Sequence, residues 1–163
     1  MKQGASMVDD LPPGNTADDP GGLDHAGLRH LLGYQLAQAN LPSREVFSRH
    51  IGRPMKLRPV EFSMLMLLAH NPGASPKQLR QALAVSAPNL TVLLDRVEQR
   101  GWIQRQKSET DGRAQNVYLT QAGTELARRA YEASTTMESE LLKRLSDGER
   151  AMLRELLAKV SRR

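Results

Sequence analysis

Hydrophobic residues recur every three or four positions along much of this chain, a spacing that is typical of amphipathic helices. Helices are predicted to begin near residues 23, 59, 75, 86, 120 and 146. The helix near 59 should run to about His70, and the helix that Thr120 caps should extend through Leu145. Ser146 and Glu149 form a capping box at the start of the last helix. The helix near 59 is apolar on most sides, which indicates a buried, central position. Pro42 should kink or break the first helix, which we expect to end by Gly52-Arg53-Pro54, because an interior proline removes a hydrogen bond and clashes with the preceding turn.

Two short helices in the middle of the chain have clear start signals. Ser75 is followed by Pro76 and, three residues on, by Gln78, which is a capping box with proline at the first helical position. Ser86 opens the next helix, which is expected to stop at Gly101. The apolar stripe of this helix consists of Leu90, Leu93, Leu94 and Val97.

A small hairpin is predicted directly after these helices. Residues 102–103 and 117–119 are strand-like, and the polar segment between them contains Asp111-Gly112. Two short helices followed by a basic hairpin are the layout of a winged helix-turn-helix, a fold that reads DNA. The predicted fold class is therefore mainly α with a small β-hairpin wing, flanked by dimerisation helices.

The predicted domains follow from this layout. Residues 1–22 are rich in Pro, Gly and Asp and are expected to form a disordered acidic tail. Residues 57–120 form the predicted DNA-binding domain, and residues 23–56 and 121–163 form a helical dimerisation region. Leucine stripes in that region need a partner, and a second copy of the chain is the simplest one. A symmetric dimer places two reading helices roughly 34 Å apart, which matches a palindromic operator.

Charge and composition narrow the choice of partner. The net charge is +5, although residues 1–24 hold one lysine against five aspartates, so the rest of the chain is more basic still. A basic body fits a polyanion, while lysines and arginines that merely keep helices soluble are the alternative. The chain has no cysteine, which excludes disulfides and thiolate metal sites. No apolar run reaches the roughly 18 residues of a membrane span, so a cytoplasmic protein is expected.

The helix that begins at Ser86 is expected to carry the base contacts, because the second helix of a helix-turn-helix enters the major groove. Asn89 can pair with adenine, whereas Ala87 and Val92 can touch only a thymine methyl. Ser86 is predicted to cap the helix whether or not it also binds phosphate. The full set of predicted DNA contacts is Ser75, Ser86, Ala87, Pro88, Asn89, Thr91, Val92, Arg96, Lys107 and Arg113.

The hairpin tip, residues 107–115, is the second predicted DNA contact. Arg113 can enter a minor groove or hold the phosphates across it. Asp111 would repel DNA if it were unpaired, so we expect it to pair with Arg113 or with Arg96 and to orient the wing. Acidic and basic residues nearly balance in this segment, and a solvated hairpin of mixed charge is the alternative.

These residues resemble those of the MarR family of bacterial transcription regulators. The matching stretches are LRPVEFSMLMLLAHNPGASPKQL, LTVLLDRVEQRGWIQRQ and DGRAQNVYLTQAG, and the Asp-x-Arg to Leu-Thr constellation in the last is the most specific. With residues 146–157, which resemble the family's final helix, the match covers about 24–162. The resemblance implies a homodimer that reads a palindrome, usually as a repressor released by a small ligand. It also implies that Arg113 is the minor-groove arginine and that Asp111 orients it.

Three positions depart from the family's pattern. Ala84 stands where many members have a turn glycine, so a strained or rearranged turn is expected. Val92 replaces a common DNA-contacting arginine, and Gly112 replaces a second wing arginine. Direct readout is therefore expected to be weaker than usual, or shifted toward the wing.

The resemblance further implies a cleft for a small ligand, often an aromatic acid, between the helical dimerisation region and the predicted DNA-binding domain. Each residue that could line it is alternatively an ordinary surface residue: His30, Tyr34, Arg49, His50, Arg58 and His70. The four histidines include no pair at i, i+4 spacing, so no metal or cofactor is expected.

The predicted function is a sequence-specific, DNA-binding transcriptional regulator, a homodimeric repressor released from its operator by a small ligand. Its predicted partners are double-stranded DNA, a second copy of the chain and the effector. The alternative is a winged-helix module for protein assembly or for non-specific DNA binding. The sequence contains no nucleophile–base pair and no phosphate loop, so an enzyme is not expected.

Overall fold

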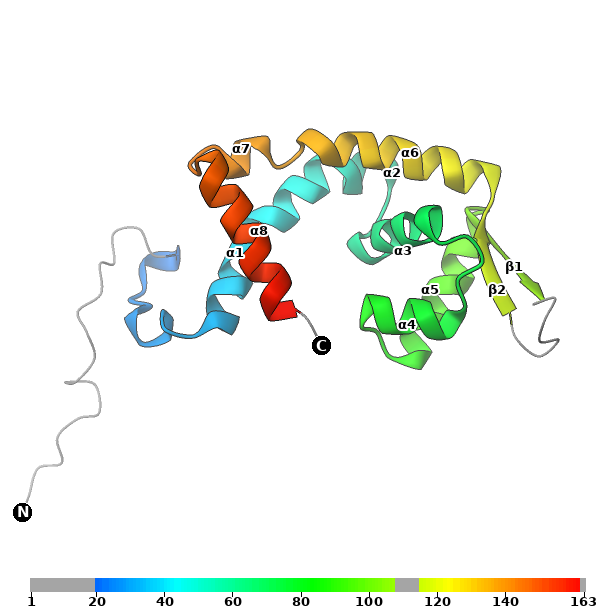
Figure 1. Cartoon of the computed structure of the whole chain (residues 1–163), viewed down its shortest axis with the longest axis horizontal. Helices are drawn as coiled ribbons and strands as arrows, with labels where there is room; N and C mark the ends of the chain where they lie inside the picture. Colours follow the sequence, from blue (N-terminus) through cyan, green and yellow to red (C-terminus); the bar gives the residue numbers. More distant parts are fainter. Residues whose placement is uncertain (1–19, 108–114, 162–163) are drawn as a thin grey trace, which may run out of the picture. The chain divides into compact units, whose positions relative to one another are not determined.

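The computed structural model describes residues 20–107 and 115–161 (Figure 1). The described part is helical apart from one two-stranded hairpin, which confirms the predicted fold class. Contacts between residues divide the chain into two compact units, Met1–Arg44 and Glu45–Arg163. Within the described ranges, no helix is long and apolar enough to cross a membrane.

The first unit begins its long helix later than predicted. Short 3-10 turns cover Pro20–Gly22 and Ala26–Leu28, and helix α1 spans Leu32–Phe47, reaching into the second unit. Asp24 Oδ1 accepts a hydrogen bond from the Ala26 amide at 2.8 Å, which closes the turn that leads into Ala26–Leu28. The rest of the predicted tail lies outside the described residues.

Pro42 lies inside α1 and does not break it, so of the predicted kink or break the break is excluded. Proline removes only its own hydrogen bond, and the neighbouring turns keep the helix intact. The irregularity appears later, as the π-helical turn η4 over Ser48–Gly52, which is followed by the single turn α2, Arg53–Met55. The helical segment therefore passes through Gly52-Arg53-Pro54 and ends at Lys56, whose φ of 52° is left-handed.

The reading module, which is the predicted DNA-binding domain of residues 57–120, is built on helix α3. This helix spans Pro59–His70, as predicted. Helix α4 spans Pro76–Leu83 and helix α5 spans Ala87–Gln99. Strand β1 (Ile103–Lys107) pairs antiparallel with β2 (Gln115–Leu119).

The hairpin is joined to the helices through its second strand. The Val117 amide donates to the Ala74 carbonyl at 3.0 Å, and the Gly73 amide donates to the Val117 carbonyl at 3.1 Å. These bonds join β2 to the segment between α3 and α4, so the wing and the helices share one framework.

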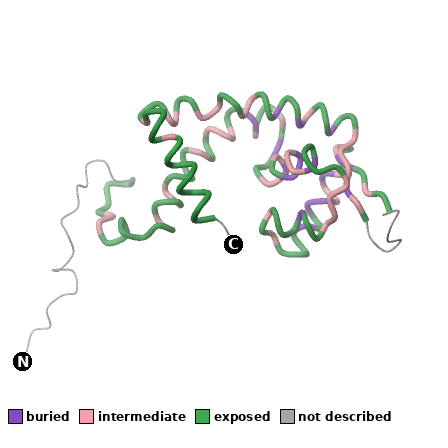
Figure 2. Tube along the Cα trace, in the orientation of Figure 1, coloured by how far each residue is buried: buried purple, intermediate pink, exposed green. Residues whose placement is uncertain are grey.

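One hydrophobic core holds this module together (Figure 2). Buried positions lie on α3, α5, both strands and the adjoining face of α6, Gln121–Thr136. Its largest fully buried hydrophobic side chains are Ile51, Met64, Leu65, Leu68, Leu79, Val97, Ile103 and Val117.

The helix predicted from Thr120 through Leu145 is interrupted. Thr120 caps α6 as expected, with its Oγ1 accepting from the Gly123 amide at 3.0 Å, but α6 ends at Thr136 and the short α7 covers Ser139–Leu142. Ser134 and Thr135 donate their hydroxyls to backbone carbonyls three residues back, at 2.7 Å each. Such local bonds compete with helix geometry, which gives a physical reason for the break.

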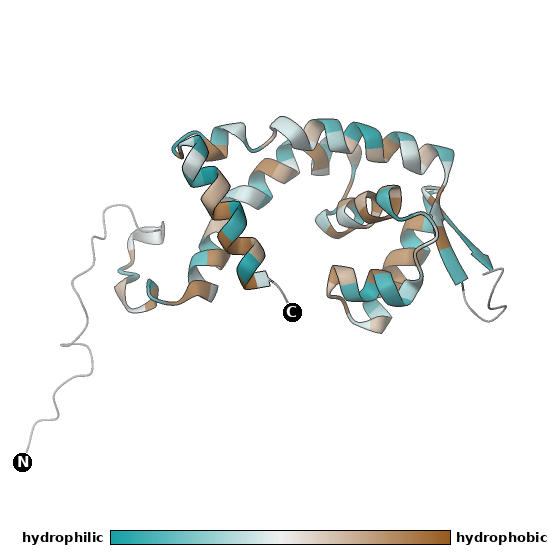
Figure 3. Cartoon of the chain, in the orientation of Figure 1, coloured by the Kyte–Doolittle hydropathy of each residue, from teal (hydrophilic) through white to brown (hydrophobic). Residues whose placement is uncertain are grey.

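Helix α8 spans Asp147–Ser161 and starts at the predicted capping box of Ser146 and Glu149. None of its residues is buried (Figure 2), and hydrophobic and hydrophilic residues alternate along the helix (Figure 3). The exposed apolar residues are Met152, Leu153, Leu156, Leu157 and Val160.

Candidate nucleic-acid interface

The turn between α4 and α5 sets the geometry of the candidate interface. Ala84 closes it with φ 52° and ψ 40°, the left-handed conformation that glycine adopts freely and alanine does not. Its amide donates to the Gln81 carbonyl at 3.3 Å, so the turn is strained but fully formed. The expectation of a strained turn at this position is confirmed.

Ser86 caps α5, as predicted. Its Oγ accepts a hydrogen bond from the Asn89 amide at 3.4 Å, which leaves the hydroxyl hydrogen available to an outside acceptor. Pro88 has no amide hydrogen and the Asn89 and Leu90 amides are bonded to Ser86, so the Ala87 amide is the one left to meet a phosphate at this partly positive helix end. Ser86 can therefore both cap the helix and donate to DNA.

Ser75 is less free than Ser86. It forms the predicted capping box with Gln78, and its hydroxyl also donates to Gln78 Oε1 at 2.8 Å. A phosphate contact by Ser75 would have to displace that bond.

The outward face of α5 has the predicted orientation. Leu90, Leu93, Leu94 and Val97 are buried in the core. The N-terminal positions predicted to meet DNA are all exposed: Ser86, Ala87, Pro88, Asn89, Thr91 and Val92. The DNA contacts themselves remain predictions.

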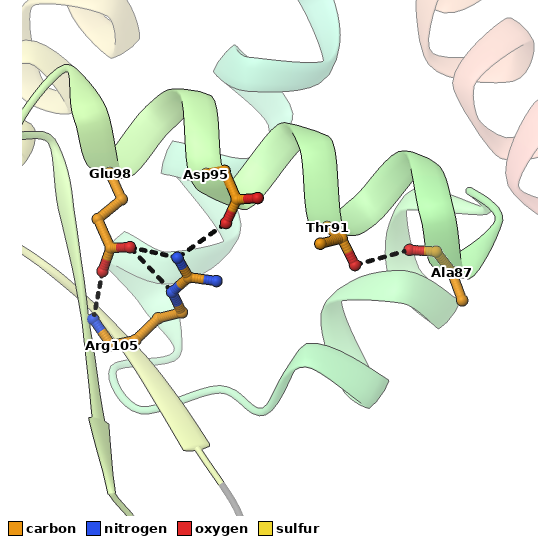
Figure 4. Close-up of polar contacts among 5 residues, drawn as sticks. All are labelled: Ala87, Thr91, Asp95, Glu98 and Arg105. Atoms are coloured by element: carbon orange, nitrogen blue, oxygen red, sulfur yellow. Dashed lines mark hydrogen bonds and ion pairs between the residues drawn. The ribbon is translucent and has the colours of Figure 1, made fainter.

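Thr91 has a more restricted role than its position suggests. Its hydroxyl donates to the Ala87 carbonyl at 3.2 Å (Figure 4). In this rotamer the oxygen offers only acceptor capacity, so it matches a base amino group better than a phosphate.

Further along α5, the exposed face would be acidic without a partner from the wing. Arg105 of β1 reaches across to it, with Nη2 at 2.8 Å from Asp95 Oδ1 and Nε at 3.0 Å from Glu98 Oε2 (Figure 4). The Arg105 amide also donates to Glu98 Oε1 at 3.2 Å. The hydrogen bond from the Arg105 side chain holds the pKa of Glu98 below its usual value, so the Glu98 carboxylate stays charged and compensated.

The cluster of Arg105, Asp95 and Glu98 was not predicted from the sequence. A signal was present, since Arg105 lies two residues after Ile103 on the same face of β1, and Ile103 is buried. A cation on the inward face of a strand requires an anionic partner. Sequence spacing alone could not show that the partner lies on α5.

Arg96, a predicted DNA contact, faces inward toward a buried carboxylate. Its Nη1 lies 3.6 Å from Oε1 of Glu61, a residue of α3 that is 1% exposed. Arg100 lies 3.6 Å from the other Glu61 oxygen and donates to the Lys56 carbonyl at 2.8 Å. Arg96 therefore forms an ion pair with Glu61, and its charge fixes α5 against α3.

The predicted wing contacts are only partly visible. Lys107 ends β1 and is exposed. Arg113 and Asp111 lie outside the described residues, and their roles stay predictions. On α4, Lys77 and Arg80 are exposed and form no ion pair with any described residue. These two residues were not among the predicted contacts. Their three-residue spacing places them on one face of α4, the first helix of the helix-turn-helix, which can contact the DNA backbone.

The predicted ligand residues are divided between the two units. Tyr34 hydrogen-bonds His25 within the first unit, where His30 is exposed, and Arg49 pairs with Glu45 at 3.0 Å in the second. His50 and Arg58 are exposed. Only His70, of the predicted set, lines a hollow of about 350 Å³ between α3 and α6. The other residues of its lining are Met66, Ala69, Thr124, Ala127, Arg128 and Tyr131.

Comparison with known proteins identifies this architecture. The model of the MarR family matches residues 56–114. The regulator PecS of Dickeya dadantii is 37% identical over 122 residues, which are 72% of this chain and 70% of that protein. The transcriptional repressor CouR, solved bound to a 23-mer DNA duplex, is 34% identical with a TM-score of 0.79, over 86% of this chain and 99% of its own.

A second DNA-bound structure has the same fold. A mutant of Escherichia coli MarR, solved in complex with operator DNA, is 26% identical with a TM-score of 0.74, over 80% of this chain and 94% of its own. The exposed N-terminal face of α5, the hairpin wing and these matches agree. The chain belongs to the MarR family and is a transcriptional regulator that binds DNA.

Proposed function

We propose that the protein is a homodimeric repressor that binds a palindromic operator and is released by a small ligand. The observation that carries this proposal is the apolar face of α8. Five hydrophobic side chains on it are between 40 and 58% exposed. A contiguous apolar face of this kind on a soluble protein marks an interaction surface.

A second copy of the chain is the partner that fits best. Helix α8 has no role in the core of the reading module, as its residues are all at least partly exposed. Leu32, Leu36 and Leu41 of α1 are also at least 40% exposed. An isologous interface would bury such faces and set two copies of α5 for successive major grooves.

Repression follows from occupancy of the operator. CouR is described as a transcriptional repressor, which supports the same sign of regulation here. Release requires a ligand that binds more tightly to a conformation in which the two reading helices no longer fit successive grooves.

The hollow between α3 and α6 is the place where such a ligand fits best. Its volume of about 350 Å³ suits a small aromatic molecule, with Met66 and Ala127 on the apolar side and His70 and Arg128 on the polar side. Arg128 is paired with Glu125 at 2.7 Å and with Glu132 at 2.5 Å, both on the surface. Exposed pairs contribute little, so a ligand carboxylate can replace one at small cost.

The dimer is tested by charge substitution on α8. The double variant Leu153→Glu, Leu156→Glu should sediment as a monomer and lose most operator affinity, because two carboxylates would face an apolar partner surface. Ala158→Glu, on the opposite face of α8, is the matched control and should remain dimeric. A dimeric double variant would show that α8 is not the interface.

The ligand is tested by thermal shift with a panel of aromatic acids. A ligand that binds the native state should raise the Tm and weaken operator binding in the same concentration range. Arg128→Met should reduce the Tm shift, whereas Arg154→Met on α8 should not. If no acid shifts the Tm, or if the shift is unaffected by Arg128→Met, the hollow is not the effector site.

A further inference from the structure

A second hollow, of about 330 Å³, lies beside the N-terminal half of the reading helix. Val60 of α3 and Val85 of the α4–α5 turn form one side of it. The other side comes from α5 and consists of Asn89, Val92, Leu93 and Arg96. This hollow is separate from the one between α3 and α6, and it opens beside the exposed face of α5 that is predicted to meet DNA.

The hollow combines apolar walls with one free amide. Val92 is 56% exposed, an unusual position for valine in the middle of a DNA-facing helix. Asn89 lies three residues before it, so the two side chains are neighbours on one helix face. Within the described part of the chain, the carboxamide of Asn89 makes no hydrogen bond, and its donors and acceptor are free.

The hollow offers no free cation. Arg96 is its charged member, and its guanidinium is directed at the buried carboxylate of Glu61, 3.6 Å away. Phosphate and the guanine edge are therefore poor matches, since both are normally bound by free arginine or lysine. An apolar surface beside a free amide matches the major-groove edge of A·T pairs, which carries the thymine methyl and the adenine N6 and N7.

We propose that this hollow selects for thymine and adenine in each operator half-site. Val92, with Val60 and Val85 beside it, receives a thymine 5-methyl group, while the Asn89 carboxamide pairs with adenine N6 and N7 in the same half-site. Val92 thus sets a base preference of its own and does not merely weaken readout. This inference rests on the proposed function, because it needs a defined operator.

The first experiment is in vitro selection from random duplexes with the full chain. Selected sites should form an inverted repeat with an invariant thymine and an adenine at fixed places in each half. If selection yields no common sequence, the proposed function itself fails. A common sequence without an invariant thymine overturns this inference alone.

The second experiment removes only the methyl group. Replacing the selected thymine by deoxyuridine should weaken binding roughly fourfold in one half-site and about fifteenfold in both, the effect of one or two buried methyl groups. The same replacement at a flanking thymine is the DNA control. Val92→Ala should bind thymine and deoxyuridine operators equally, whereas Gln104→Ala, on β1, should keep the difference.

The third experiment addresses the amide. Asn89→Ala should lose between about fivefold and 150-fold of the preference for the selected adenine over guanine, and should keep the thymine–deoxyuridine difference. Both variants change exposed side chains, so their melting temperatures should match that of the parent protein. A Val92→Ala protein that still distinguishes thymine from deoxyuridine, or an Asn89→Ala protein that keeps its adenine preference, would overturn the assignment.

Discussion

Ala84 occupies a conformation that costs an alanine about 1 to 2 kcal/mol relative to glycine. Its φ of 52° closes the turn that aims α5, so the strain lies at the entry to the reading helix. Ala84→Gly should raise the free energy of unfolding by about 1 kcal/mol in urea denaturation. Ala82→Gly, in the preceding helix, is the matched control and should lower it by a similar amount. A destabilising Ala84→Gly would contradict the strain.

At the same scale, Arg105 determines whether the exposed face of α5 is acidic. Arg105→Met leaves Asp95 and Glu98 uncompensated, so operator affinity should fall about tenfold or more through repulsion of the phosphates. Stability should fall by less than about 1 kcal/mol, because the cluster is partly exposed. Adding Asp95→Asn and Glu98→Gln should restore most of the affinity, and failure to restore it would show that Arg105 contacts DNA itself.

The lowered pKa of Glu98 has a defined pH signature. A carboxylate whose folded pKa lies below its ordinary value of 4.5 stabilises the protein above that value, and the contribution is lost as the pH falls through the folded pKa. Urea denaturation should show Glu98→Gln less stable than the parent at pH 7, with the difference shrinking below about pH 4.5. A difference that is constant with pH would mean that the ionised carboxylate contributes nothing.

At the scale of elements, Gly123 controls how α6 meets the wing. A Cβ on this residue would lie 1.9 Å from the Trp102 carbonyl oxygen, so no other residue fits without moving the backbone. Gly123→Ala should lower the free energy of unfolding by more than about 2 kcal/mol, measured by chemical denaturation. Gly148→Ala is the matched control, since nothing lies within 4 Å of its Cβ position, and it should be neutral or mildly stabilising.

Helix and strand positions in the reading module were predictable because local signals agreed with burial. Ser75, Ser86 and Thr120 cap their helices where the sequence indicated, and α3 has the predicted bounds. An error arose where side chains compete with the backbone, as at Ser134 and Thr135. Such competition depends on rotamers that periodicity does not reveal.

The candidate site was predictable only in part, for a related reason. Exposure along α5 follows from its leucine stripe, which sequence spacing shows directly. Pairing between elements, such as Arg105 with Glu98 or Arg96 with Glu61, depends on how strands and helices pack. A buried glutamate in a helix of apolar residues was a visible anomaly, but only the packed structure names its partners.

For the whole molecule, a strong dependence of DNA binding on salt follows from the net charge of +5 and from Lys77 and Arg80 of α4, which are exposed and form no ion pair with a described residue. Each neutralised phosphate contributes a slope of about −0.9 to a plot of log affinity against log salt. Lys77→Met should reduce the slope by about one per half-site and weaken operator and random duplexes alike. A slope unchanged by Lys77→Met would show that α4 does not contact the backbone.

The close approach at Gly123 has a mechanical consequence. The Thr120 amide donates to the Trp102 carbonyl at 3.0 Å, and its hydroxyl donates to the Gly101 carbonyl at 2.6 Å. These two bonds fix the start of α6 to the segment that follows α5. The hollow lined by Thr124 and Tyr131 begins one helical turn further along α6. A ligand bound there would press on α6 close to these bonds and tilt α5 about its N-terminal end. Such a tilt should raise the dissociation rate of the DNA complex and leave its association rate almost unchanged.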